Sequence, residues 1–174
     1  MSRNTRVVFA ILLYLGTCGS RPFEDTDREV RFYRTNIRLL TNLIEQHSNL
    51  PLGSCLLSQL PSSLDPLIPE STQLYLRTRR RLAKGLHKLN QRHSLPELLS
   101  KLPTPCDNNQ VALKRLERLL TLQRAQFETV LATTILVLEK YFFKEKAQNF
   151  RKLYQEYFPG RDMEKEFSRR YNAP

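Results

Sequence analysis

The stretch from Asp107 to Phe158, DNNQVALKRLERLLTLQRAQFETVLATTILVLEKYFFKEKAQNFRKLYQEYF, decides the fold because it contains neither glycine nor proline. Its apolar residues return every three or four positions, which is the spacing of side chains on one face of an α-helix. Between Val130 and Phe143 they nearly encircle the helix, so we expect this part at the centre of a core. The predicted inner face consists of Leu113, Leu116, Leu120, Phe127, Leu131, Thr134, Leu138 and Tyr141.

The same stretch is long enough to form either one helix or two. A single helix would be about 75 Å long at 1.5 Å per residue, which exceeds the size of a domain of this length. The polar run from Lys144 to Asn149 interrupts the apolar face, and the face then resumes at Phe150. We therefore expect a break or kink, at a position that the pattern does not fix. After Pro159, residues 161–174 are expected to form a charged tail.

Two further amphipathic helices are predicted upstream. The first runs from Thr26 to about His47, because Thr26 and Glu29 have the spacing of a capping box. The second runs from about Ser71 to Gln91. A third, short helix is expected from Ser94 to Leu102. The predicted inner faces of the two long helices are Val30, Tyr33, Ile37, Leu40 and Ile44 in the first, and Tyr75, Leu82, Leu86 and Leu89 in the second.

A proline-rich segment, Ser48–Glu70, separates these two helices. It holds four prolines and Cys55, together with eight leucine or isoleucine residues. So many apolar side chains favour order over disorder. We therefore expect a long ordered crossover whose leucines pack against the helices.

The first twenty residues have the order of a secretory signal peptide. Arg3 and Arg6 precede the apolar run Val7–Leu15, and small residues follow as far as Ser20. An uncleaved anchor is the alternative, but nine apolar residues fall far short of the roughly 20 needed to span a bilayer. We expect residues 1–20 to be removed and residues 21–174 to form a single secreted helical domain.

Two cysteines remain after such a cleavage, Cys55 and Cys106. An even number in an oxidising compartment predicts one disulfide between them. The alternative is an intermolecular bridge that links two copies of the chain in a homodimer.

The charge of the chain, +11, favours an acidic partner. Such partners include sulfated glycans, anionic lipids, nucleic acids and acidic receptors. Secretion makes nucleic acid the least expected of them. Basic residues on neighbouring turns of the second helix are candidates for binding heparan sulfate, namely Arg77, Arg80, Arg81, Lys84 and Lys88. The same region also contains the pattern R-x-R-R that secretory convertases cleave, formed by Arg77, Arg79 and Arg80. Such cleavage would require the helix to unwind.

The sequence lacks the motifs that are typical of catalysis. The sequence has no glycine-rich phosphate loop, no H-E-x-x-H and no G-x-S-x-G. The three histidines, His47, His87 and His93, lie apart from any acidic residue at the spacing of a triad, and we expect them on the surface. The sequence therefore predicts neither an enzyme nor a metal or cofactor site.

The order of these segments is similar to that of the helical cytokines, nearest the short-chain haematopoietic group. The similarity covers Thr26 to Cys106 best and includes the segment LPELLSKLPTPC that ends at Cys106. It implies an up-up-down-down four-helix bundle that brings single-pass receptor chains together through exposed faces of its first and last helices. The charged residues on those faces that become receptor-binding candidates are Arg31, Arg34, Arg38, Glu45, Lys114 and Arg118.

Two other functions also fit the sequence. A basic, secreted helical protein with exposed aromatic residues is similar to the sperm lysins, which act on membranes or egg coats. A carrier of apolar molecules would need a sizeable cavity among Phe127, Leu131, Ile135 and Leu138.

Overall fold

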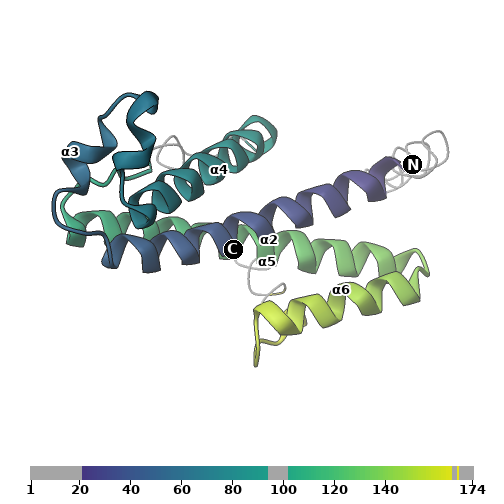
Figure 1. Ribbon diagram of the computed structural model, residues 1–174. Helices are drawn as coiled ribbons and strands as arrows, with labels where there is room; N and C mark the ends of the chain where they lie inside the picture. The colour runs from purple at the N-terminus through teal and green to yellow at the C-terminus, as the bar shows by residue number, and fades with distance from the viewer. Residues whose placement is uncertain (1–20, 94–101, 166–167, 169–174) are drawn as a thin grey trace.

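The chain folds into α-helices and short turns over all the residues that the structure describes. This structure is a computed structural model that describes residues 21–93, 102–165 and 168 (Figure 1). The all-α prediction is confirmed for these residues, whereas the predicted signal peptide and most of the predicted helix at 94–102 lie outside them. The helical elements are α2 (Arg21–Ser48), α3 (Ser54–Ser58), the 3₁₀ helix η1 (Ser62–Leu67), α4 (Glu70–His93), α5 (Asn109–Lys140) and α6 (Lys144–Tyr157).

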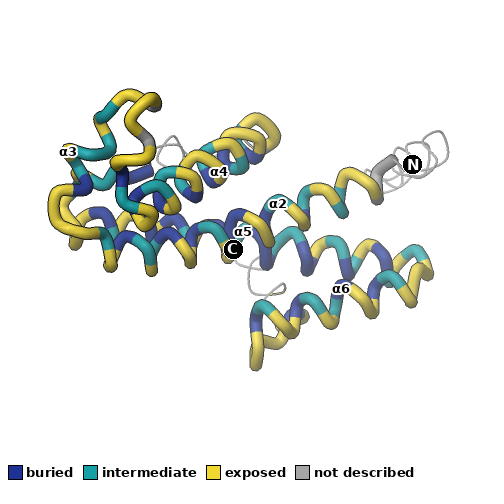
Figure 2. The backbone as a smooth tube through the Cα atoms, viewed as in Figure 1, coloured by how far each residue is buried: buried dark blue, intermediate teal, exposed yellow. Residues whose placement is uncertain are grey.

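Helix α2 lies at the centre of the molecule. It packs extensively on both α4 and α5, and α6 packs on α5 (Figures 1 and 2). Its start lies five residues before the predicted one, so Thr26 and Glu29 lie inside the helix and do not cap it.

The helix directions differ from the up-up-down-down order that the resemblance implied. His47 at the end of α2 meets Tyr75 near the start of α4, so these two helices are antiparallel. Lys146 at the start of α6 reaches Asp27 near the start of α2, and Arg34 farther along α2 reaches Tyr157 at the end of α6. Helices α2 and α6 therefore run in the same direction.

Helix α5 runs against α2 and α6, and hence in the direction of α4 (Figure 1). The observed order is up, down, down, up. The reason lies in the segment between α2 and α4, which turns back through α3 and η1 and joins antiparallel neighbours. It is not the long crossover between parallel helices that was expected.

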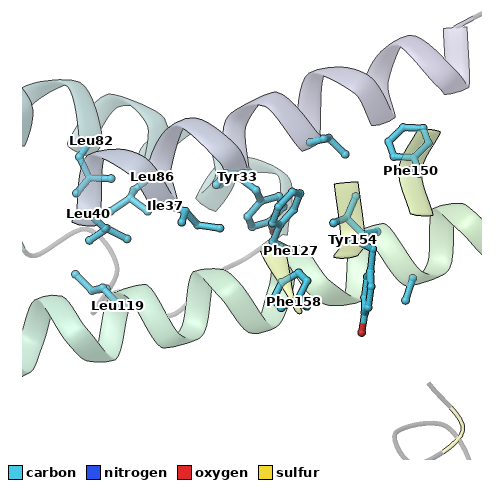
Figure 3. Packing of buried hydrophobic residues seen from close by; sticks show 14 of the residues in the cluster. Tyr33, Ile37, Leu40, Leu82, Leu86, Leu119, Phe127, Phe150, Tyr154 and Phe158 are labelled. Carbon is cyan, nitrogen blue, oxygen red and sulfur yellow. The ribbon is translucent and has the colours of Figure 1, made fainter. Parts of the chain in front are cut away.

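The core is one continuous cluster between α2 and its neighbours. Its largest fully buried side chains include Tyr33 and Leu40 from α2, Tyr75 from α4 and Phe127 from α5. The rings of Tyr33 and Phe127 stack with centroids 5.7 Å apart (Figure 3). Each such side chain contributes about 1.5–3 kcal/mol when it is buried completely.

The predicted inner faces are mostly confirmed. All four predicted residues of α4 are buried, and so are all those of α2 except Ile44. In α5 the buried face is rotated slightly from the prediction. Leu113, Leu120 and Thr134 are only half-buried, and Ala112, Leu119 and Ile135 take the inner positions. Tyr141, which follows α5, is also half-buried.

The expected break in the long helical stretch is present between α5 and α6. It comprises Tyr141, Phe142 and Phe143, and the chain reverses there within three residues. The Phe143 amide donates to the Leu138 carbonyl at 2.9 Å, and the Phe142 amide donates to the Glu139 carbonyl at 3.1 Å. Past α6, Met163 is buried, so the first residues of the predicted charged tail belong to the fold.

Candidate interaction surfaces

The outer face of α4 carries a row of five basic side chains. All five are exposed, and α4 has no acidic residue after Glu70 at its start. At 100° per residue they lie within an arc of about 100°. This arc is opposite the face formed by Tyr75, Leu82, Leu86 and Leu89, which is buried. We call this row the basic stripe; it consists of Arg77, Arg80, Arg81, Lys84 and Lys88.

Arg79 does not belong to this stripe. Its guanidinium is half-buried and donates to the carbonyl oxygens of Pro103 at 2.8 Å and Leu102 at 3.0 Å. Arg79 thus holds the segment that precedes α5 against α4. A convertase would have to break these bonds and unwind α4 to reach the peptide bond after Arg80.

The receptor-binding candidates are exposed on α2 and on the first half of α5. Those on α2 extend over about 21 Å from Arg31 to Glu45 at 1.5 Å per residue. Arg34 is the most constrained of them, because its guanidinium donates to the Tyr157 hydroxyl at 3.4 Å and lies 5.9 Å from the centre of that ring. The hydrogen bond that Arg34 donates to Tyr157 raises the pKa of Arg34.

An apolar surface lies at the end of the molecule where α2 turns toward α4. A disulfide between Cys55 and Cys106 ties α3 to the segment before α5, as predicted. The leucines between the two helices were expected to pack inward, but several of them face solvent. We call this surface the leucine end; it consists of Leu52, Leu56, Leu64, Leu67 and Leu74.

A second apolar surface lies at the opposite end, at the turn between α5 and α6. The side chain of Phe142 is 83% exposed and that of Phe143 is 48% exposed. Phe142 has a φ of 65°, in the left-handed region that costs a non-glycine residue roughly 1–2 kcal/mol. We call Phe142 and Phe143 the aromatic turn. A bulky aromatic residue kept in strained backbone and facing solvent is a functional candidate.

Among the described residues, Glu128 of α5 is the most buried carboxylate, and it belongs to a network with Tyr154 of α6 and with Arg161 just after α6. Glu128 is 2% exposed; its carboxylate accepts from the Tyr154 hydroxyl at 2.9 Å and from Arg161 at 2.9 and 3.0 Å. A cavity of about 410 Å³ lies beside it, lined by Thr121, Arg124, Ala125, Glu128, Tyr157, Phe158, Pro159 and Arg161. Phe127, Leu131, Ile135 and Leu138, which a carrier would need around its ligand, are fully buried and do not line this cavity.

His47 is also structural, contrary to the surface position that was predicted. It is 4% exposed, and its Nδ1 lies 3.0 Å from the Tyr75 hydroxyl, which donates to the Pro103 carbonyl at 3.2 Å. Because the Tyr75 hydroxyl donates its one proton to Pro103, the hydrogen bond between His47 and Tyr75 is assigned with Nδ1 of His47 as the donor and the hydroxyl oxygen as the acceptor. Burial lowers the pKa of His47, although nearby Asp107 partly opposes this. His87 is exposed as predicted.

Over residues 21–93 and 102–165, no three or more histidine, cysteine or acidic side chains are grouped so that they could hold a metal ion. None of the described helices is long and apolar enough to cross a membrane. No protein-family model, curated protein or solved structure matches this chain.

Proposed function

We propose that this protein is a secreted signalling ligand that binds cell-surface receptor chains and brings two of them together. The observation that carries the proposal is the pair of exposed apolar surfaces, the leucine end and the aromatic turn. Large exposed apolar groups of this kind mark protein interfaces. Two such surfaces on one molecule suit a ligand with two partners.

The distance between the two surfaces supports this function. The disulfide places α3 beside the start of α5, and the aromatic turn follows the end of α5. Helix α5 has 32 residues, so the two surfaces are separated by about 48 Å at 1.5 Å per residue. Because α5 is a continuous helix that packs extensively on α2, the two partners would be held at a fixed separation.

The charged faces of α2 and α5 supply further candidates for receptor contact. Arg31, Arg38, Lys114 and Arg118 project to solvent between the two apolar surfaces. The resemblance to helical cytokines agrees with the all-helical composition and with the disulfide, but not with the helix order. The proposal therefore rests on the exposed surfaces and not on a shared bundle topology.

The test measures binding of the secreted chain to an array of cells that each display one single-pass receptor ectodomain. It measures signalling on cells that carry both complete receptor chains. One variant alters the leucine end (Leu56→Ser with Leu67→Ser), and another alters the aromatic turn (Phe142→Ser with Phe143→Ser). Each variant should still bind one receptor chain and lose the second. Neither should signal, and a mixture of the two should not restore signalling, because one molecule must carry both surfaces.

Exposed apolar residues elsewhere on α5 provide the matched control. Leu122→Ser with Val137→Ser removes two side chains that are 43% and 42% exposed, and this variant should bind both receptor chains. Equal binding and signalling by all three variants would overturn the proposal. Binding to no ectodomain, together with leakage of lipid vesicles on addition of the protein, would favour the lysin-like function instead.

A further inference from the structure

We infer that the basic stripe of α4 is a binding site for a sulfated glycosaminoglycan, separate from the receptor-binding surfaces. The stripe is a continuous row and not a scatter of charges. From Arg77 to Lys88 it extends about 16 Å along the helix at 1.5 Å per residue. This row is suited to a linear polyanion that carries a sulfate or carboxylate at short, regular intervals.

The charges of the stripe are not neutralised within the fold. None of the five side chains pairs with a carboxylate among the described residues. Arg77 donates to the Gln73 amide oxygen at 3.3 Å, and the Lys88 ammonium lies 5.6 Å from the centre of the Phe32 ring. The one described ion pair of α4 is that of Arg92 with Asp25, which lies beyond the end of the stripe. The stripe therefore presents exposed cations that no described carboxylate neutralises.

The position of α4 makes the stripe accessible over its whole length. Of the long helices, only α2 packs extensively on α4, and it covers the opposite face (Figures 1 and 2). Between Arg77 and Lys88, Arg79 is the one arginine outside the stripe, and it donates hydrogen bonds to the carbonyl oxygens of Leu102 and Pro103. The fold thus sorts the six lysines and arginines between Arg77 and Lys88 into one anchoring arginine and five available residues.

A glycan fits this face better than a membrane does. A helix that lies on a bilayer inserts an apolar face beside its basic residues. The apolar face of α4 is instead buried against α2, and Leu74 is its one large exposed apolar side chain. The predicted signal peptide favours an extracellular polyanion over a nucleic acid.

The test measures binding of the full secreted chain to heparin at several salt concentrations. The stripe variant is R80Q/R81Q/K84Q/K88Q. The matched control, R31Q/R38Q/K114Q/R118Q, removes the same net charge from α2 and α5. Binding to a flexible polyanion weakens with salt with a slope of about 0.7 per cation, so the stripe variant should lose a slope of about 3. At physiological salt each lost cation should weaken binding by about fivefold, and four would give a loss of several hundredfold. Screening by salt reduces this to about a hundredfold.

The control variant should keep the slope and affinity of the unaltered protein within a few-fold. A third variant, R80K/R81K/K84R/K88R, keeps the charge and should keep most of the binding, which separates loss of charge from loss of fold. Equal weakening of the stripe and control variants would overturn the inference. The inference would also be overturned if phosphatidylserine vesicles or duplex DNA displaced bound heparin from the protein as effectively as free heparin does. Receptor binding by the stripe variant is expected to persist, so this result and the proposed function fail independently.

Discussion

The side-chain amide of Asn36 in α2 occupies the space that a β-carbon would take at Gly85 in α4. The Asn36 Cγ lies 3.1 Å and its Nδ2 3.3 Å from the position of that atom. Asn36 is 1% exposed, and its amide nitrogen has no hydrogen-bond partner among the described residues. The two helices can therefore approach this closely only because residue 85 has no side chain.

The first prediction concerns this contact. Gly85→Ala should lower the free energy of unfolding by about 2 kcal/mol, because overpacking outweighs the gain of about 1 kcal/mol in helix propensity. Urea denaturation measures the change. In the double variant N36A/G85A the clash is gone, so it should be more stable than G85A alone. A G85A protein more stable than the unaltered one would show that α2 and α4 move apart without cost.

The second prediction concerns the buried carboxylate of Glu128. Tyr154→Phe removes the hydroxyl that donates to it at 2.9 Å and should destabilise the fold by about 2 kcal/mol, as hydrogen bonds to charged groups do. Tyr157→Phe is the matched control, because its hydroxyl accepts a 3.4 Å bond from exposed Arg34 and should contribute less than about 0.5 kcal/mol. Equal urea midpoints for the two variants would contradict the structural role of Glu128.

The third prediction concerns pH. Burial lowers the pKa of His47 in the folded state below its ordinary value of 6.5, so the unfolded chain binds the proton more readily. Stability from this group is present above pH 6.5 and is lost as the pH falls toward the folded pKa. The protein should therefore unfold at lower urea at pH 5.5 than at pH 7.5.

Two histidine variants test the origin of this effect. His47→Asn keeps a donor toward Tyr75 but cannot titrate, so its urea midpoint should change less between the two pH values. His87→Gln alters an exposed ring and should retain the full pH dependence. The assignment to His47 fails if both variants respond to pH alike.

The fourth prediction separates stability from binding at the aromatic turn. Phe142→Gly should stabilise the fold by about 1 kcal/mol, because glycine adopts a φ of 65° without strain and the lost ring is mostly exposed. The same change at Phe143, whose φ is −83°, should destabilise it. If the proposed function is correct, the more stable Phe142→Gly protein should bind one receptor chain less tightly. A Phe142→Gly protein as unstable as Phe143→Gly would show that the turn carries no strain.

Much of the fold could be predicted from the sequence, because helical spacing specifies which side chains avoid water. The buried faces of α2 and α4 follow from that spacing. The absence of glycine and proline after Asp107 likewise indicated a long helical region with a break. The break itself could not be placed, because no residue at Tyr141–Phe143 is a helix breaker, and the reversal depends on how α6 packs back onto α5.

Helix order and individual contacts were harder to predict for a physical reason. An apolar face specifies burial but not the direction of the neighbouring helix, so the antiparallel pairing of α2 and α4 had no local signal. The burial of His47 also had no local signal in the sequence, because its partner Tyr75 lies 28 residues away. The close approach of α2 to Gly85 had no specific signal in the sequence beyond the presence of a glycine in mid-helix.

One continuous helix, α5, connects the leucine end to the aromatic turn. The distance between these two surfaces is therefore coupled to their relative orientation around the helix axis. Adding one residue to that helix would lengthen it by about 1.5 Å but would also twist one end by about 100° relative to the other. An insertion would preserve the orientation of both surfaces only if it added a whole number of helical turns to α2 and α5 together. Relatives of this protein should therefore tolerate length changes in residues 49–69 far more readily than in either long helix.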